Sequence, residues 1–170
     1  MAKDSYTDAI AMLKADHRKV EDLFEQFEKA RTDARRSSLA HDICTELKIH
    51  MMLEEEIFYP AFEGKIDGDD IGEAFVEHDS AKVLINDIEA SGLKDEYFES
   101  KVHVMSEEVE HHVKEEEEPG KGVFAQCRKT DVDLVALRDQ MLARKEELMA
   151  QAKAGKLPPI KPIAINLVEA

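Results

Sequence analysis

Four stretches of this chain repeat apolar residues every three or four positions, the spacing of one face of an α-helix. They cover approximately residues 6–30, 38–61, 70–90 and 95–118. With only five prolines and seven glycines in 170 residues, little interrupts these patterns. Apolar stripes on neighbouring helices bury one another. The sequence therefore predicts an all-α protein, an antiparallel up-down four-helix bundle.

Capping and helix-breaking residues predict the ends of the second stretch. Ser37 or Ser38 is the expected N-cap. Ile57 and Ala61 continue the inward stripe of this helix, and Pro60 is expected to disturb its last turn. On this pattern the second helix ends close to Ala61.

The C-terminal part of the chain predicts one more helix and an extended tail. The additional helix covers approximately residues 131–153 and is expected to pack outside the bundle. The tail, LPPIKPIAINLVEA, contains three of the five prolines and is expected to be extended. We therefore predict a bundle over residues 1–128, and a C-terminal helix and tail over 129–170 that pack on the bundle or on a partner subunit. A homodimer through this helix or tail is the corresponding expectation.

Six polar residues fall on the inward stripes, where a bundle normally places apolar side chains: His17, His50, Glu54, His78, His112 and Glu116. Burying an unpaired polar or charged group costs several kcal/mol. Two of the stripes carry a histidine followed four residues later by a glutamate, a spacing of about 6 Å along one helical face. Such a histidine can bind one metal ion while the glutamate reaches between two. Imidazole and carboxylate together suit iron or manganese, so the sequence predicts a two-metal site in the bundle.

The fourth stretch allows more than one choice of ligands. His111 and Glu115 have the same spacing as His112 and Glu116, and His103 begins a third pair of this kind. The apolar stripe of this helix favours His112 and Glu116 as the inward pair. His111 is then expected at a helix edge and His103 in solvent.

Charge and cysteine content restrict the partners and the compartment. The net charge of −15 repels nucleic acid and anionic membranes, so neither is an expected partner. No apolar run approaches the roughly 18 residues that a membrane span needs. Cys44 and Cys127 lie far apart without a CxxC motif, and the N-terminus does not resemble a signal peptide. These features predict a cytoplasmic protein with reduced thiols.

The segments DHRKVEDLF, HMMLEEEIFYP, EHDSAK and EHHVKEEEE resemble the metal-bearing segments of the hemerythrin-like (HHE cation-binding) family. The resemblance covers about residues 6–125. It implies a four-helix bundle that holds two iron ions with an oxo or hydroxo bridge. By the same resemblance, the six inward residues are the metal ligands. Members of the family are linked to O2 binding, to iron or oxygen sensing, and to the handling of peroxide or nitric oxide.

One position departs from hemerythrins. They carry a second histidine four residues after the first on the third helix, and Lys82 stands there in this chain. Glu21, Glu55 and Glu115 are the candidates to complete the site. Tyr59 is expected to pack behind the ligands, where its hydroxyl can hydrogen-bond an oxygen species.

Two functions are consistent with this sequence. The first is a non-heme di-iron protein that binds or processes O2, peroxide or NO. The alternative is a non-catalytic module for iron or oxygen sensing, or for iron storage. The sequence contains no nucleophile–base pair, phosphate loop or organic cofactor motif, so a dedicated enzyme is not expected and any peroxide or NO chemistry falls to the metals. Manganese and zinc are the alternative metals, although the four-ligand preference of zinc fits six ligands poorly.

Overall fold

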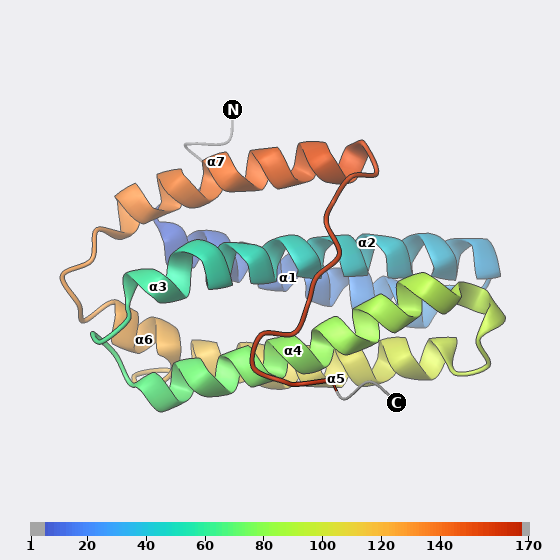
Figure 1. The fold of residues 1–170 in the computed structure, drawn as a ribbon, viewed down its shortest axis with the longest axis horizontal. Coiled ribbons are helices and arrows are strands. Elements are labelled where there is room, and N and C mark those ends of the chain that lie inside the picture. The colour runs from blue at the N-terminus through green and yellow to red at the C-terminus, as the bar shows by residue number, and fades with distance from the viewer. Residues whose placement is uncertain (1–5, 168–170) are drawn as a thin grey trace.

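Residues 6–167 are described by a computed structural model, in which four long helices form a bundle (Figure 1). These helices are α1 (Ala9–Lys29), α2 (Asp33–Leu53), α4 (Gly68–Ser91) and α5 (Phe98–Glu117). α1 packs on α2 and α5, and α4 packs on α2 and α5. The described residues form no β-strand. The predicted all-α class and the bundle are confirmed.

Shorter elements connect and extend the long helices. A π-helical turn, η1 (Glu54–Phe58), and the short α3 (Tyr59–Ala61) continue α2. The 3-10 turn η2 (Gly92–Lys94) links α4 to α5. α6 (Val123–Cys127), which the sequence pattern did not reveal, follows α5, and α7 (Leu134–Lys153) comes next. None of the described helices is both long enough and apolar enough to cross a membrane.

The second helix begins earlier than the sequence predicted. Thr32, not Ser37 or Ser38, is its N-cap, because the Thr32 hydroxyl accepts a hydrogen bond from the Arg35 amide. Both serines lie within the first turns of α2. The predicted N-cap was therefore wrong by about one and a half helical turns.

The helix ends at Ala61, as predicted, but its last turns are not regular α-helix. Before Pro60 the chain forms a π turn, in which the Tyr59 amide donates to the Glu54 carbonyl. The extra residue in this turn rotates the following side chains relative to a regular α-helix. Phe58 and Tyr59 are consequently buried, whereas Ile57 and Ala61, predicted on the inward face, are only half-buried.

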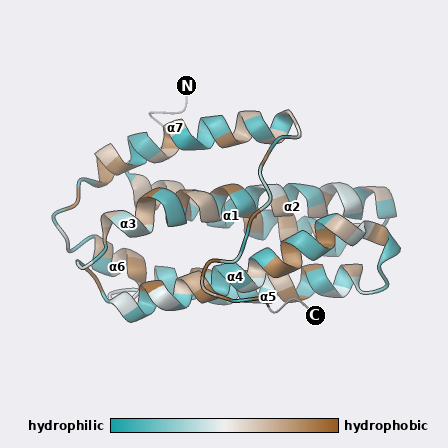
Figure 2. Cartoon of the chain, in the orientation of Figure 1, coloured by the Kyte–Doolittle hydropathy of each residue, from teal (hydrophilic) through white to brown (hydrophobic). Residues whose placement is uncertain are grey.

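Hydrophobic residues along each helix (Figure 2) build two core clusters. One cluster contains Leu13, Leu53 and Phe124, together with residues of α7. The other contains Val20 and Ile85 and lies further along the bundle. The polar residues of the predicted site come between the residues of these two clusters along the helices.

α7 lies outside the four-helix bundle and packs against α1 and α2 (Figure 1). The tail that follows, residues 154–167, crosses to α4 (Figure 1). Ile160 is buried in the second core cluster, and its carbonyl accepts a hydrogen bond of 2.9 Å from the Asn86 amide group. Ile160 of the tail therefore packs on the bundle of its own chain.

Candidate metal centre

All six residues predicted from the sequence meet in the interior of the bundle. His17 comes from α1, His50 from α2 and His78 from α4, while His112 comes from α5. Glu54 opens the π turn after α2, and Glu116 lies near the end of α5. Each of the six is at most 7 % exposed. Four helices therefore supply one buried cluster of imidazoles and carboxylates.

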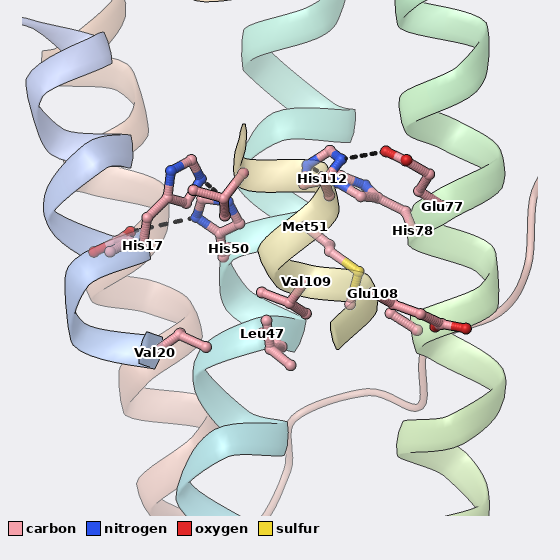
Figure 3. A pocket seen from close by; sticks show the side chains of 13 residues that line it. His17, Val20, Leu47, His50, Met51, Glu77, His78, Glu108, Val109 and His112 are labelled. Atoms are coloured by element: carbon pink, nitrogen blue, oxygen red, sulfur yellow. Dashed lines mark hydrogen bonds and ion pairs between the residues drawn. The ribbon is translucent and has the colours of Figure 1, made fainter. Parts of the chain in front are cut away.

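The histidines form two pairs, and each pair joins two helices. The Nε2 atoms of His17 and His50 lie 3.1 Å apart. Those of His78 and His112 lie 3.2 Å apart (Figure 3). Two donor atoms at about 2.1 Å from one cation, at right angles, would be about 3 Å apart. The spacing within each pair is therefore that of two ligands of one cation.

The two glutamates lie between the pairs. Glu54 Oε2 is 3.2 Å from Nε2 of His50 and 3.2 Å from Nε2 of His78. Glu116 Oε2 is 3.4 Å from Nε2 of His17 and 3.6 Å from Nε2 of His112. Each carboxylate thus contacts one histidine of each pair. This is the position from which a carboxylate can bridge two metal ions.

Tyr59 joins this cluster, although the sequence placed it only in the packing behind the ligands. Its hydroxyl oxygen lies 2.9 Å from Glu116 Oε1 and 3.3 Å from Glu54 Oε2. The same oxygen is 3.5 Å from His78 Nε2. Tyr59 therefore stands on the side of the His78–His112 pair. This position depends on the π turn before Tyr59, which a pattern with 3.6 residues per turn does not predict.

Each histidine also has a carboxylate at its outer ring nitrogen, Nδ1. Glu117 lies 2.7 Å from that of His17 and Glu77 2.7 Å from that of His112 (Figure 3), while Glu55 is 2.9 Å from that of His78. Asp16 Oδ2 is 3.8 Å from that of His50, within reach of an ion pair but too far for a hydrogen bond. A partner at the outer nitrogen orients an imidazole whose inner nitrogen binds a metal.

The electrostatics of the cluster favour the protonated forms of His50 and His78 when only protein groups are present. Burial acts to lower the pKa of His50, but the charge of Glu54 and the contact with Asp16 outweigh it and raise the pKa to about 10. Burial likewise opposes the shift of His78, yet hydrogen bonds to Glu54 and Glu55 raise its pKa to about 9. Burial acts to raise the pKa of Glu54, but His50 and His78 hold it well below its usual value. Burial and the nearby carboxylates raise the pKa of Tyr59.

Three buried polar atoms of the described residues lack a hydrogen-bond partner: His50 Nδ1, Glu54 Oε1 and Glu116 Oε2. Two of them are carboxylate oxygens in the middle of the cluster. An unsatisfied buried charge is costly unless it is paired or coordinates a metal. Donor atoms of His17, His50, Glu54 and Glu116 lie within 4.8 Å of one another, and so do those of Glu54, His78 and His112. The residues present therefore fit two cations that share Glu54.

A small cavity of about 30 Å³ opens beside the four histidines (Figure 3). Its apolar lining includes Val20, Leu47, Met51 and Val109, which the second core cluster contributes. A cavity needs about 10–15 Å³ of such space to hold one water molecule. The cavity can therefore hold a diatomic molecule or one of similar size next to the imidazoles.

The alternatives left open by the sequence lie outside the cluster. His111 and Glu115 are 63 % and 44 % exposed in their side chains, and they contact each other and Glu77 at the surface. His103 is also exposed. The inward choice of His112 and Glu116 therefore agrees with the geometry, while their role as ligands stays a prediction.

None of the three residues proposed to compensate for Lys82 reaches the centre. Glu21 pairs with Arg18 at the surface, and Glu115 lies near His111. Glu55 lies near the outer nitrogen of His78 and contacts Lys82. Lys82 itself is buried. An oxygen atom that does contact the cluster is that of Tyr59.

The fold and this cluster define a class of protein: an all-helical bundle with a buried histidine–glutamate site suited to metal ions. The family model described as hemerythrin HHE cation binding domain matches residues 8–119, and the chain belongs to this family. The chain also resembles the crystal structure of a hemerythrin HHE cation binding domain-containing protein from Mycobacterium kansasii. The two are 24 % identical with a TM-score of 0.72, over 87 % of this chain and 91 % of that one. No curated protein sequence matches the chain.

Proposed function

We propose that this member of the HHE family is a non-heme di-iron protein that binds or processes O2, peroxide or NO. The observation that carries the proposal is the arrangement of Glu54 and Glu116, each of which contacts one histidine of each pair. Two histidines and one oxygen from each carboxylate would provide four protein ligands for each ion. About two positions of a six-coordinate ion then remain for other groups.

The donor set supports iron over zinc. Zinc in structural sites is almost always four-coordinate and tetrahedral. Here four imidazoles, two carboxylates and the Tyr59 oxygen surround one space, which suits metals of higher coordination number. Manganese is the second choice by the same chemistry.

The two pairs differ in their relation to Tyr59. Tyr59 lies on the His78–His112 side, and no tyrosine oxygen contacts the His17–His50 pair among the described residues. A ligand from outside the protein would occupy coordination positions that the protein side chains leave open. The cavity beside the histidines offers an apolar space for such a ligand, of a size that suits a diatomic molecule or a peroxide.

The protein residues have separate roles in this proposal. Iron, when bound, would supply the electron exchange with the small ligand. The outer carboxylates Asp16, Glu55, Glu77 and Glu117 orient the imidazoles. Tyr59, whose pKa is raised, keeps its hydroxyl proton at neutral pH and can donate a hydrogen bond to Glu54 or Glu116. The apolar cavity lining limits access of water.

The test is the metal content and absorption spectrum of the protein from iron-replete cells, before and after O2, peroxide or NO is added. Two irons per chain with a spectrum that changes on addition would support the proposal. Two irons with an unchanging spectrum would instead favour the alternative of iron storage or sensing. One zinc per chain, or a folded protein that takes up no iron, would refute the di-iron assignment.

A further inference from the structure

The C-terminal extension, residues 129–167, lies beyond the part of the chain that the family model matches. It nevertheless contacts acidic residues close to the histidine–glutamate cluster at two separate places. One contact comes from α7 and the other from the tail. Through these acidic residues, the two contacts reach histidines that belong to different pairs.

The first contact begins at Lys145 of α7. Its ammonium group forms a close ion pair with Asp16 of α1. The other carboxylate oxygen of Asp16 faces Nδ1 of His50 at 3.8 Å. Asp16 is buried, so its charge needs a partner inside the protein. Lys145 provides that partner and thereby holds the carboxylate beside His50.

The second contact begins at the backbone of the tail. The amide groups of Ile163, Ala164 and Ile165 all donate to the carboxylate of Asp79, with distances of 2.8 and 2.9 Å for Ile163 and 2.8 Å for Ile165. Three successive amides that converge on one carboxylate form an anion-binding nest. Asp79 itself is fully buried.

A buried lysine connects Asp79 to a carboxylate beside the histidine–glutamate cluster. Lys82 Nζ is 2.9 Å from Asp79 Oδ1 and 2.8 Å from Glu55 Oε1. The same Glu55 oxygen is 2.9 Å from Nδ1 of His78. Lys82 is only 2 % exposed, so Asp79 and Glu55 share one ammonium group away from water. The position of Glu55 at His78 therefore depends on what else binds Asp79.

The side chain of Ile163 indicates that the tail acts here through its backbone. This side chain is 64 % exposed, whereas its amide is engaged with Asp79. Burial of apolar surface therefore does not explain how residue 163 is held. Ile160, by contrast, anchors the preceding part of the tail in the core.

We infer that the C-terminal extension positions one histidine of each pair: α7 acts on His50 through Lys145 and Asp16, and the tail acts on His78 through Asp79, Lys82 and Glu55. Without the three tail amides, Asp79 has fewer hydrogen-bond donors and binds the ammonium group of Lys82 more strongly. Lys82 then binds Glu55 less strongly. The His78–His112 pair then binds its cation more weakly, while the His17–His50 pair keeps its affinity. This inference rests on the proposed function, since it requires one cation at each pair.

The test compares ferrous iron binding, without oxygen, in chains that differ only in the tail. A chain that ends at Lys161 keeps the Ile160 anchor but lacks the three amides. Competition with a ferrous chelator is expected to show one of the two irons bound about tenfold more weakly, the loss typical when an outer partner of a ligand is removed. A chain that ends at Ile165 is the control and retains both affinities.

Two single-histidine variants assign the effect to a pair. In His17→Ala, which keeps the His78–His112 pair intact, the shortened tail weakens the remaining iron about tenfold. In His78→Ala, which keeps the other pair, the shortened tail has no effect. Equal effects in both variants would mean that the tail only stabilises the fold and would overturn the inference.

A substitution in the full-length chain covers the case in which the shortened protein does not fold. Ile163→Pro removes one amide donor, while Ile163→Ala keeps it and changes the exposed side chain by a comparable amount. Weaker binding of one iron in the proline variant alone supports the inference. Identical binding in both variants contradicts it. Failure of the unaltered protein to bind two irons would instead count against the proposed function.

Lys145→Met tests the α7 contact by the same measurement, with the exposed Lys153→Met as its control. The iron at the His17–His50 pair is expected to bind about tenfold more weakly in Lys145→Met. The effect should persist in His78→Ala and disappear in His17→Ala. An unchanged affinity in His78→Ala would overturn this half of the inference.

Discussion

The hydroxyl oxygen of Tyr59 lies 2.9 Å from a carboxylate oxygen of Glu116, a residue 57 positions later in the chain. The same hydroxyl is 3.3 Å from Glu54, five positions earlier. Tyr59 and Glu54 share one face because the π turn between them pairs residues five apart. One tyrosine thus contacts both carboxylates that lie between the histidine pairs.

Tyr59→Phe is expected to destabilise the metal-free protein by about 1–3 kcal/mol, because both buried carboxylates lose this donor. Urea unfolding after removal of metal measures the change. Tyr97→Phe is the matched control, since Tyr97 is 59 % exposed, and it should stay within about 0.5 kcal/mol of the unaltered protein. Equal stability of Tyr59→Phe and Tyr97→Phe would show that the hydroxyl does not stabilise the cluster.

Replacing His50 and His112 together with alanine is expected to abolish stoichiometric iron binding, because each pair loses one imidazole. Metal analysis of the purified variant measures this. His111→Ala is the control, because His111 is exposed next to His112 and does not enter the cluster. Two irons per chain in the double variant would refute the assignment of the ligands.

The metal-free protein should lose stability as the pH rises from about 6.5 to 10. The folded pKa values of His50 and His78 are raised to about 10 and about 9, above the ordinary value of 6.5. Folding therefore binds protons, and this stabilisation is complete below pH 6.5 and is lost as the pH passes through the folded values. The free energy of unfolding should fall by about 1.4 kcal/mol per pH unit for each histidine.

Urea unfolding at several pH values checks this slope. The iron-loaded protein is the comparison, because a bound cation replaces the protons on the inner nitrogens and high pH no longer removes a stabilising charge. A metal-free protein whose stability is constant between pH 7 and 9 would contradict the prediction.

Gly122→Ala is expected to destabilise the protein by about 1–3 kcal/mol and to disturb Glu116. A Cβ at residue 122 would lie 2.4 Å from the carbonyl oxygen of Glu115 and 2.6 Å from that of Glu116, both of them backbone atoms that cannot rotate away. Thermal unfolding and iron content measure the two effects. Gly72→Ala, where a Cβ meets nothing within 4 Å inside α4, should instead be neutral or stabilising by up to about 1 kcal/mol. Similar behaviour of the two variants would argue against this contact.

Much of the centre follows from the sequence because it depends on local periodicity. A residue four positions after another lies on the same helical face whatever the rest of the chain does. His50 with Glu54 and His112 with Glu116 were predictable on this ground, and each of the four residues lies in the interior. The long helices were equally accessible, since few residues interrupt their apolar stripes.

Helical periodicity has no information about a π turn or about contacts between helices. A regular helix would have placed Ile57 and Ala61 inward, and only the inserted residue in the π turn brings Tyr59 to the carboxylates. The pairing of His17 with His50, and of His78 with His112, joins residues more than thirty positions apart.

The sequence by itself determined which residue types face the interior, because side-chain direction repeats with the helical turn. Only the tertiary structure decided which of them meet. The carboxylates beside the outer histidine nitrogens all come from other helices than their histidines, and the contacts of Lys145 and of Ile163–Ile165 come from the C-terminal extension. These partners are fixed by how the helices and the tail pack, and packing depends on all the surfaces that are buried together.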